Sequence, residues 1–344
     1  MINLVQFPGL GLSLHINRVA ISLGGFNIYW YGIILAAGLM GGLLFAFRYG
    51  PDFGIDTDRM VDVVVIGTVM AIVCARIYYV AMAPFQYQSL WEMIDLRNGG
   101  IAIYGALIGA FVFGGLACKW RKIPLLQMFD LVAMGFLIGQ GIGRWGNFVN
   151  QEAFGCNTTL PWGMYSEATQ SYLAANAASL AAQGMTVDPT MPVHPTFLYE
   201  SLWCFAGLFM LFRFMKKRCF HGEIFLLYAV WYGCGRFWIE GLRTDSLMLS
   251  AALNLRASQL VAAVSVIAAL ALEIHFRRIY RKAPMMVNLA VADLNAYAKA
   301  FPDGVCAKAL PASASHAEFV QKTKEWNREI QEKAKSADSA QAEE

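Results

Sequence analysis

Seven long apolar segments, separated by polar connections, constrain the fold of this chain more than any other feature of its sequence. The segments cover 28–48, 60–83, 101–118, 127–148, 196–214, 223–240 and 257–276. At about 1.5 Å per helical residue, each is long enough to cross the hydrocarbon core of a bilayer. Charged residues make up only 15% of the chain, against about 25% in soluble domains. The sequence therefore predicts an all-α, polytopic membrane protein with seven transmembrane helices.

The distribution of Lys and Arg among the connections predicts the orientation of these helices. Alternate connections are basic, whereas the long connection 151–194 contains neither Lys nor Arg. The basic residues on one side include Lys119, Arg121, Lys122, Lys216, Lys217, Arg218, Arg277, Arg278, Arg281 and Lys282. Because basic connections stay in the cytoplasm, we expect the N-terminus outside the cell membrane and the C-terminus in the cytoplasm.

The same patterns divide the chain into a membrane domain and a tail. Residues 1–282 form the predicted seven-helix membrane domain, in which 151–194 is an external arm or head with a short helix near Ser171–Gln183. Residues 283–344 form a predicted cytoplasmic tail whose last part is expected to be disordered. An amphipathic helix is also expected in the tail, because one stripe of it carries Phe319, Thr323, Trp326 and Ile330.

A cation at the end of the fourth apolar segment is the first indication of function. Arg144 lies at a depth where a positive charge costs roughly 2.5 kcal/mol or more unless it is paired or lies beside water. Asn147 follows three residues later, on nearly the same helix face, and Glu152 follows as the helix ends. This group predicts an anionic ligand at the membrane surface.

A second polar group lies on the sixth apolar segment. Tyr232, Arg236, Glu240 and Arg243 follow one another at spacings of four, four and three residues, so a continuous helix would place them within an arc of about 80°. This column could be a ladder of ion pairs that neutralise one another. Alternatively, its two guanidiniums exceed its one carboxylate, and together with Arg144 they could bind phosphate oxygens in the forked geometry that arginine offers.

Several other polar features allow two interpretations each. His194 and the following proline, shortly before Glu200, either start a helix or supply a base. Arg76 is either a functional intramembrane cation or a side chain that reaches the interface. The glycine-rich runs at 105–109 and 139–143 either allow close helix packing or contact a ligand. The seven cysteines are scattered without a Cys-x-x-Cys pair, so neither a disulfide framework nor a metal site is predicted.

The longest of these patterns resembles the signature of a known family. Gly143-Arg-Trp-Gly-Asn-Phe-Val-Asn-Gln-Glu-Ala-Phe-Gly155 is similar to the signature of the bacterial prolipoprotein diacylglyceryl transferases. The resemblance covers roughly residues 15–280, including Trp30-Tyr31-Gly32, Gly99–Gly105, His194–Glu200 and Tyr232–Arg243. It implies an enzyme of the bacterial inner membrane that transfers the sn-1,2-diacylglyceryl group from phosphatidylglycerol to the lipobox cysteine thiol of prolipoproteins. Glycerol-1-phosphate is then the other product, and the reaction is the first step of lipoprotein maturation.

The resemblance also implies roles for individual residues. Arg144 and Arg243 match arginines that the family requires, and the supporting residues are Tyr31, Asn147, Glu152, Gly155, Tyr232, Arg236 and Glu240. Tyr104 stands where many members carry a histidine, and a phenol is a poor general base at neutral pH. The expected partners are phosphatidylglycerol, prolipoprotein signal peptides with a lipobox cysteine, and membrane lipids. No cofactor, metal or nucleic acid is expected.

The expected chemistry follows from the charge that develops during transfer. A thiol sulfur attacks a glycerol carbon while a phosphate ester leaves, so guanidiniums that bind the departing phosphate lower the barrier. We expect Arg144 and Arg243 to clamp the phosphate, and Glu240 and Asn147 to hold these arginines in position. Tyr104 is expected to orient substrate or to relay a proton. The substrate's own phosphate could equally accept the thiol proton.

An anion or lipid transporter is the main alternative to an enzyme, because basic residues in membrane spans also mark permeation routes. In this sequence the cations concentrate at the outer helix ends, which favours chemistry at the membrane surface over passage across it. The absence of an internal sequence repeat also disfavours a transporter built from repeated halves. A lipid-binding scaffold without catalytic activity is a third alternative.

Overall fold

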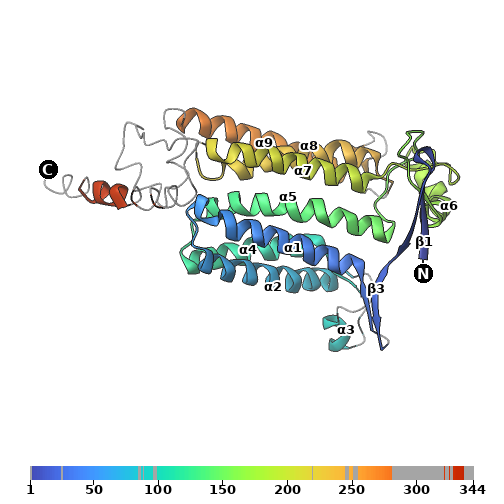
Figure 1. Cartoon of the computed structure of the whole chain (residues 1–344), viewed down its shortest axis with the longest axis horizontal. Coiled ribbons are helices and arrows are strands. Elements are labelled where there is room, and N and C mark those ends of the chain that lie inside the picture. Colours follow the sequence, from blue (N-terminus) through green and yellow to red (C-terminus); the bar gives the residue numbers. More distant parts are fainter. Residues whose placement is uncertain are drawn as a thin grey trace. The chain divides into compact units, whose positions relative to one another are not determined.

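The computed structural model of the chain describes most of the apolar segments and the connections between them. The described residues are 2–24, 26–83, 87, 89–95, 99–218, 220–244, 248–250, 255–280, 321, 325 and 328–336. Most of them are helical (Figure 1). The chain divides into two compact units, the first made of Met1–Ala46 with Val132–Arg281 and the second of Phe47–Leu131 with Lys282–Glu344.

Long helices lie at all seven predicted apolar segments, with ends that differ from the prediction by a few residues. They are α1 (Trp30–Tyr49), α2 (Thr57–Met82), α4 (Ile103–Arg121), α5 (Leu125–Asn150), α7 (Thr196–Phe214), α8 (Glu223–Leu242) and α9 (Ala257–Tyr280). Shorter helices are η1 (Pro8–Leu10), η2 (Gly50–Phe53), α3 (Leu90–Ile94), α6 (Glu167–Ala182) and η3 (Met215–Lys217). Within the described residues, six of the long helices, all except α8, are apolar and long enough to cross a membrane. In α8, Arg236 and Glu240 lower the hydropathy of the helix.

The surfaces of these helices are those of a membrane protein. Leu44 of α1 and Ile77 of α2 are each 62% exposed, and Phe209 of α7 is 64% exposed. Soluble proteins rarely expose large continuous apolar patches to water. In lipid such side chains form the natural outer surface, and helices satisfy their backbone polar groups internally.

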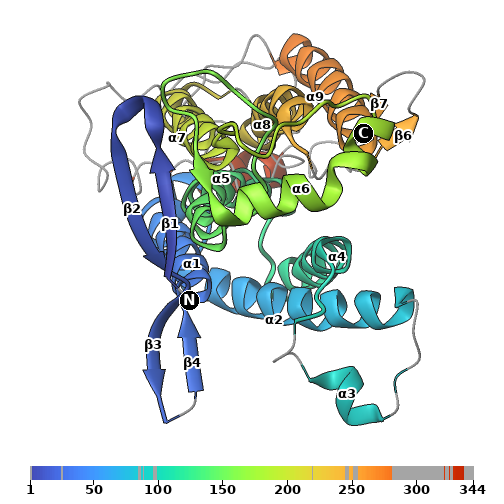
Figure 2. The ribbon, with the colours of Figure 1, turned by 90° about the vertical axis from the view of Figure 1, so that its right-hand side faces the viewer.

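In the second unit, α2 lies beside α4 (Figure 2), and glycine residues form part of the contact. A Cβ atom at Gly105 would lie 2.4 Å from the carbonyl oxygen of Cys74, and one at Gly109 would lie 2.6 Å from that of Met70. The two helix backbones are therefore close enough that only glycine fits at these positions. The interpretation of run 105–109 as a packing motif is confirmed.

In the first unit, α1 packs against α5 in the same way. A Cβ atom at Gly38 would lie 3.2 Å from the carbonyl oxygen of Gly139 of α5. Helix α5 also approaches α7, because a Cβ atom at Gly141 would lie 3.0 Å from the ring of Phe205. The run 139–143 therefore also serves helix packing. Helices α7, α8 and α9 run side by side, with α8 contacting both neighbours (Figures 1 and 2).

A pair of tryptophans joins α7 to α8. The rings of Trp203 and Trp231 stack with centroids 4.4 Å apart and an interplanar angle of 17°. Each indole N–H donates to the backbone carbonyl oxygen of the other tryptophan at 2.9 Å. A Cβ atom at Gly207 or at Gly235 would lie 2.3 Å from one of the two indole nitrogens. These glycines therefore let the polar edges of both indoles reach backbone acceptors inside the membrane domain.

Short strands add to the helices, so the all-α prediction is too narrow. The strands β1 (Ile2–Phe7) and β2 (Leu12–Asn17) form an antiparallel hairpin, which β5 (Tyr165–Ser166) extends in the order β2-β1-β5. Val5 faces Leu14 on one side and Ser166 on the other. The pairs β3 (Val19–Leu23) with β4 (Phe26–Tyr29) and β6 (Met248–Ser250) with β7 (Leu255–Arg256) are also antiparallel.

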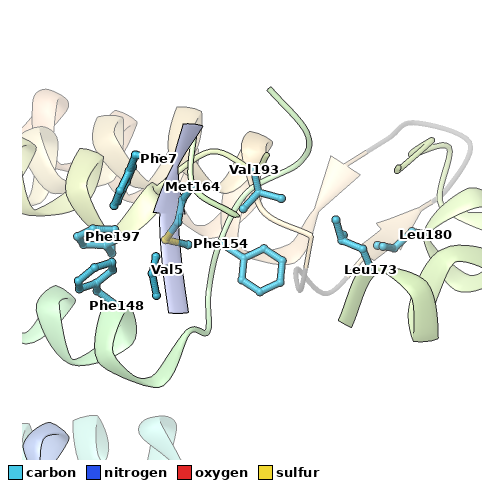
Figure 3. Close-up of a cluster of buried hydrophobic side chains, with 9 residues drawn as sticks. All are labelled: Val5, Phe7, Phe148, Phe154, Met164, Leu173, Leu180, Val193 and Phe197. Carbon is cyan, nitrogen blue, oxygen red and sulfur yellow. The ribbon is translucent and has the colours of Figure 1, made fainter. Parts of the chain in front are cut away.

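A hydrophobic core attaches residues 151–194, which we call the arm, to the ends of the helices in the first unit (Figure 3). Phe148 of α5 stacks on Phe197 of α7 with ring centroids 4.5 Å apart. The rest of the cluster comes from β1, the arm and α6, and consists of Val5, Phe7, Phe154, Met164, Leu173, Leu180 and Val193. The predicted arm helix is present as α6, which begins with a capping box between Ser166 and Thr169.

Only a small part of the predicted tail helix lies within the described residues. Residues 328–336 are helical, and Ile330 is buried. The other members of the predicted stripe, Phe319, Thr323 and Trp326, and the predicted disordered end lie outside the described residues.

Candidate active site

Four charged side chains from three helices form one ion-pair network near the arm. Arg144 of α5 pairs with Glu200 of α7 through its Nε atom. Arg236 of α8 pairs with the same carboxylate at 2.7 Å, and with Glu240 one turn further along α8 at 2.6 Å. Glu200 therefore bridges two arginines on different helices. We call Arg144, Glu200, Arg236 and Glu240 the arginine–carboxylate network.

The network is largely buried, and its formal charges balance. Glu200 and Glu240 are each 4% exposed, and the side chains of Arg144 and Arg236 are each 21% exposed. Removing one partner of a buried ion pair typically costs about 3–5 kcal/mol, because the other charge is left uncompensated. The sequence indicated an excess of cations on α8, but Glu200 of α7 supplies a second carboxylate. Glu200 binds Arg144, and Glu240 binds Arg236. That Glu240 also helps to hold Arg144 and Arg243 in position stays a prediction.

The end of α5 connects Arg144 to the arm. Nη1 of Arg144 donates to Oδ1 of Asn147 at 3.4 Å, and Nδ2 of Asn147 donates to Oε1 of Glu152 at 2.9 Å. The chain then turns sharply, because Gln151 and Ala153 have φ angles of 55° and 56°. Such left-handed conformations are uncommon without glycine and persist where the surrounding structure holds them. The structure thus brings Arg144, Asn147 and Glu152 together, as the sequence predicted.

Two predicted tyrosines lie within electrostatic range of the network. Tyr31 of α1 interacts with Arg144 and Glu152, and its ring covers Gly146, where a Cβ atom would lie 2.8 Å from the ring. Tyr232 of α8 interacts with Glu200, Arg144 and Arg236. Both tyrosines therefore flank the network from separate helices.

Tyr232 also stacks on a second tyrosine of α8, within the first unit. Its ring stacks on Tyr228 with centroids 5.7 Å apart and an interplanar angle of 11°. The hydroxyl of Tyr228 accepts a hydrogen bond from Nε2 of Gln140 at 2.9 Å. This stack fixes the ring of Tyr232 beside the network.

Arg243 lies just beyond the end of α8, so its predicted place in the helical column is wrong. The helix ends at Leu242, and Arg243 is extended, with φ −76° and ψ 146°. It forms an isolated β-bridge with Gly155 of the arm, and the N–H of Cys156 donates to the carbonyl oxygen of Leu242 at 2.7 Å. A Cβ atom at Gly155 would lie 2.7 Å from Cβ of His194. Pairing with the distant arm therefore ends the helix, and it requires glycine at the crossing.

The residues before α7 support the arm. Pro195 is the N-cap of α7, so the interpretation of His194 and its proline as a helix start is confirmed. Nδ1 of His194 lies 3.1 Å from the hydroxyl of Tyr199. That hydroxyl accepts a hydrogen bond from Nε1 of Trp162 at 2.8 Å. Burial lowers the pKa of His194, so its imidazole is neutral at neutral pH. The contacts of Tyr199 with His194 and Trp162 therefore connect the arm to the first turn of α7.

Two further candidate residues belong to the second unit. Tyr104 is the second residue of α4 and is 66% exposed, and its ring contacts that of Tyr78 with centroids 6.4 Å apart. Arg76 of α2 donates to backbone carbonyl oxygens of the connection between α2 and α4. The side chain thus binds protein backbone, which neither interpretation of the sequence anticipated.

Glu200 is the main member of the network to which the sequence assigned no role. A signal was available, because a carboxylate inside a strongly apolar helix must be paired to be stable. Its partners could not be identified from spacing, since Arg144 and Arg236 lie on two other helices that are far away in sequence.

The fold and the site together define a class of protein. This is a multi-pass helical membrane protein in which arginines and carboxylates from separate helices gather beside a polar arm. The family model described as prolipoprotein diacylglyceryl transferase matches residues 18–275. The chain belongs to the prolipoprotein diacylglyceryl transferase family and is a transferase.

Similar proteins from three Bacillus species agree with this family. Each is named phosphatidylglycerol–prolipoprotein diacylglyceryl transferase. The Bacillus cytotoxicus protein is 44% identical over 242 residues, and those of Bacillus cereus and Bacillus anthracis are 45% identical over 242 residues. Each alignment covers 70% of this chain and 86% of the relative. The family predicted from the signature at Gly143–Gly155 is confirmed, and the alternative of an anion or lipid transporter receives no support.

Proposed function

We propose that this chain transfers the sn-1,2-diacylglyceryl group of phosphatidylglycerol to the lipobox cysteine thiol of prolipoprotein signal peptides. The names of the Bacillus relatives specify both substrates. The observation that carries the proposal is the fixed guanidinium of Arg144, which Glu200 and Asn147 hold at the end of an apolar helix. A cation in this position suits the phosphate of a membrane lipid.

The reaction exchanges a C–O bond for a C–S bond. The thiol sulfur attacks the phosphate-bearing carbon of the diacylated glycerol, and the bond from that carbon to the phosphate oxygen breaks. Glycerol-1-phosphate departs with the bonding electrons, and the thiol proton passes to a base, which is either the substrate's own phosphate or a group of the protein. Negative charge grows on the departing phosphate in the transition state. Cations that are already fixed stabilise this charge without reorganisation, and they act more strongly in a site that excludes water.

In this proposal Arg144 and Arg243 bind the phosphate. Because Nε of Arg144 is directed to Glu200, its terminal nitrogens are left for Asn147 and for phosphate oxygens. Glu152 orients Asn147, and the remaining proposed binding residues are Tyr31, Tyr232 and Arg236. Glu240 helps to hold the arginines in position. Tyr104 orients the substrate or relays a proton.

We further propose that all seven long helices span the bacterial inner membrane. Helix α8 lies between α7 and α9, so its neighbours shield the charges that make it less apolar than the others. The lack of Lys and Arg in 151–194 supports an external arm and N-terminus and a cytoplasmic tail at 283–344.

The decisive experiment measures the mass of a lipobox peptide after incubation with the purified protein in phosphatidylglycerol vesicles. We expect the peptide to gain the mass of one diacylglyceryl group, with release of an equal amount of glycerol-1-phosphate. A peptide with serine in place of the lipobox cysteine and vesicles of phosphatidylcholine are the controls. No mass gain from correctly folded protein would refute the proposed function.

A further inference from the structure

One arginine of α2 binds four carbonyl oxygens of the connection that leads to α4. Nε of Arg76 donates to Met93 at 2.7 Å, and Nη2 donates to Glu92 at 2.6 Å. Nη1 donates to Gly99 at 3.0 Å and to Gly100 at 2.8 Å. Met93 and Glu92 belong to α3, whereas the two glycines precede α4. A guanidinium offers several donors in one fixed plane, a geometry that lysine cannot reproduce.

The backbone before α4 is shaped to meet this guanidinium. Gly99 and Gly100 have φ angles of 80° and 82°, a conformation that glycine adopts without strain. A Cβ atom at Gly100 would lie 2.3 Å from Nη1 of Arg76, so a larger residue would displace the guanidinium. The N–H of Ala102 also donates to the carbonyl oxygen of Ala75 at 3.1 Å. Two successive residues of α2 therefore anchor the start of α4.

The same part of α2 determines where Tyr104 lies. Helix α4 begins at Ile103, directly after the anchored Ala102. The rings of Tyr104 and Tyr78 are in contact, and a Cβ atom at Gly105 would lie 2.5 Å from Cβ of Tyr78. Since the Tyr104 ring is itself largely exposed, the start of the helix, more than packing around the ring, fixes its position.

We propose that Arg76 is a positioning residue for Tyr104 in the transfer reaction. This inference rests on the proposed function, in which the Tyr104 hydroxyl orients substrate or relays a proton. By binding carbonyl oxygens of α3 and of the two glycines, Arg76 sets where α4 starts and therefore where that hydroxyl lies. Misplacing a catalytic group by about 1 Å can slow a reaction about 100-fold. If Arg76 only stabilised the fold, its replacement would lower the amount of folded protein, and it would not change the rate of transfer through Tyr104.

A double-mutant cycle distinguishes a residue that positions Tyr104 from one that only stabilises the fold. Wild type, Arg76→Lys, Tyr104→Phe and the double variant are compared for peptide lipidation in phosphatidylglycerol vesicles. We expect Arg76→Lys to lower kcat by about 10- to 100-fold while KM for the peptide changes by less than about threefold. In the Tyr104→Phe background the same replacement should have little further effect, because the group it positions is gone. Arg59→Lys, at an exposed arginine near the start of α2, should leave kcat unchanged.

Two outcomes of the cycle would overturn the proposal. The first is a pair of losses that multiply in the double variant, which would show that Arg76 and Tyr104 act independently. The second is full activity of Tyr104→Phe. If the wild type transfers the diacylglyceryl group but the two losses multiply, only this inference is wrong. If the wild type transfers nothing, the proposed function is wrong as well.

A second variant covers the case in which Arg76→Lys does not accumulate in the membrane. Gly100→Ala keeps Arg76 but places a Cβ atom against its guanidinium, so it should enter the cycle in the same way and show the same dependence on Tyr104. If neither variant accumulates, the contacts are required for folding itself, and the proposal is wrong.

Discussion

A guanidinium near a membrane surface must be held in one orientation before it can bind a phosphate efficiently. In this protein Glu200 binds Nε of Arg144, and Asn147 accepts a hydrogen bond from Nη1. The guanidinium is therefore preorganised, so binding does not have to order it. The carboxylate also offsets the cost of keeping a cation in a largely buried place. Arg243, at its crossing with Gly155, adds a further cation to this region in the proposed site.

Replacing the two proposed clamp residues by lysine tests whether the shape of the guanidinium matters. A lysine keeps the charge, but it cannot bind Glu200, Asn147 and a phosphate in one plane. We expect Arg144→Lys and Arg243→Lys each to lower lipidation by about 100-fold or more, with little change in the amount of folded protein. Arg121→Lys, which retains the pairing partner Asp62, is the control. Near-normal transfer by both lysine variants would leave only a general positive field as their role.

Glu200 is predicted to matter for stability as well as for transfer. Glu200→Gln leaves Arg144 and Arg236 with Glu240 as the remaining carboxylate of the network, and we expect a loss of about 3–5 kcal/mol together with a lower Tm in detergent. Glu200→Asp keeps the charge and should be less harmful. The matched control is Glu167→Gln, at an exposed position at the start of α6. A Glu200→Gln protein as stable and as active as this control would show that the network contributes nothing measurable.

At the scale of elements, the helices were predictable and several of their ends were not. In lipid a helix satisfies all of its own backbone groups, so apolar length alone locates each long helix. The strands β1 and β5 could not be predicted in the same way, because each is short and they are far apart in the chain. Arg243 was misplaced for a related reason, since its extended backbone depends on pairing with Gly155. Local spacing carries no information about such distant partners.

The junction of α7 and α8 gives a prediction about helix packing. Alanine is favoured over glycine inside a helix by about 1 kcal/mol, but at Gly235 the new Cβ atom would lie 2.3 Å from the Trp203 indole nitrogen. Overpacking of this kind costs about 1–3 kcal/mol, so it should outweigh the gain in propensity. We expect Gly235→Ala to lower the Tm of the purified protein in detergent.

The control for this change is Gly114→Ala on α4, where no atom of the described residues outside the local helix lies within 4 Å of the added Cβ. This variant should leave the Tm unchanged or raise it slightly. If Gly235→Ala behaved like Gly114→Ala, the two helices could separate at no cost, and the tryptophan pair would not be the contact that sets their spacing.

At the scale of the whole molecule, the order of apolar segments and the position of basic residues yield a topology that labelling can test. Single cysteines are introduced at the exposed positions Ser179 in α6, Lys122 at the end of α4 and Arg278 near the end of α9, in an active background without the native cysteines. Because basic connections stay in the cytoplasm, a membrane-impermeant maleimide should label Ser179→Cys in spheroplasts. It should label Lys122→Cys and Arg278→Cys only after the membrane is opened.

The Arg278→Cys variant, in α9, tests whether α8, the least apolar of the proposed spans, crosses the membrane. If α7 ends in the cytoplasm and α8 crosses the membrane, then α9 returns the chain to the cytoplasm and the cysteine is protected. If α8 does not cross, α9 carries the chain outward, and the same cysteine reacts in closed spheroplasts. Helix α8, which carries Arg236 and Glu240, would then have less contact with lipid. The free-energy cost of its charges would be lower as a result. Labelling of Arg278→Cys in closed cells that protect Lys122→Cys would therefore reduce the spans to six, and protection of both supports seven.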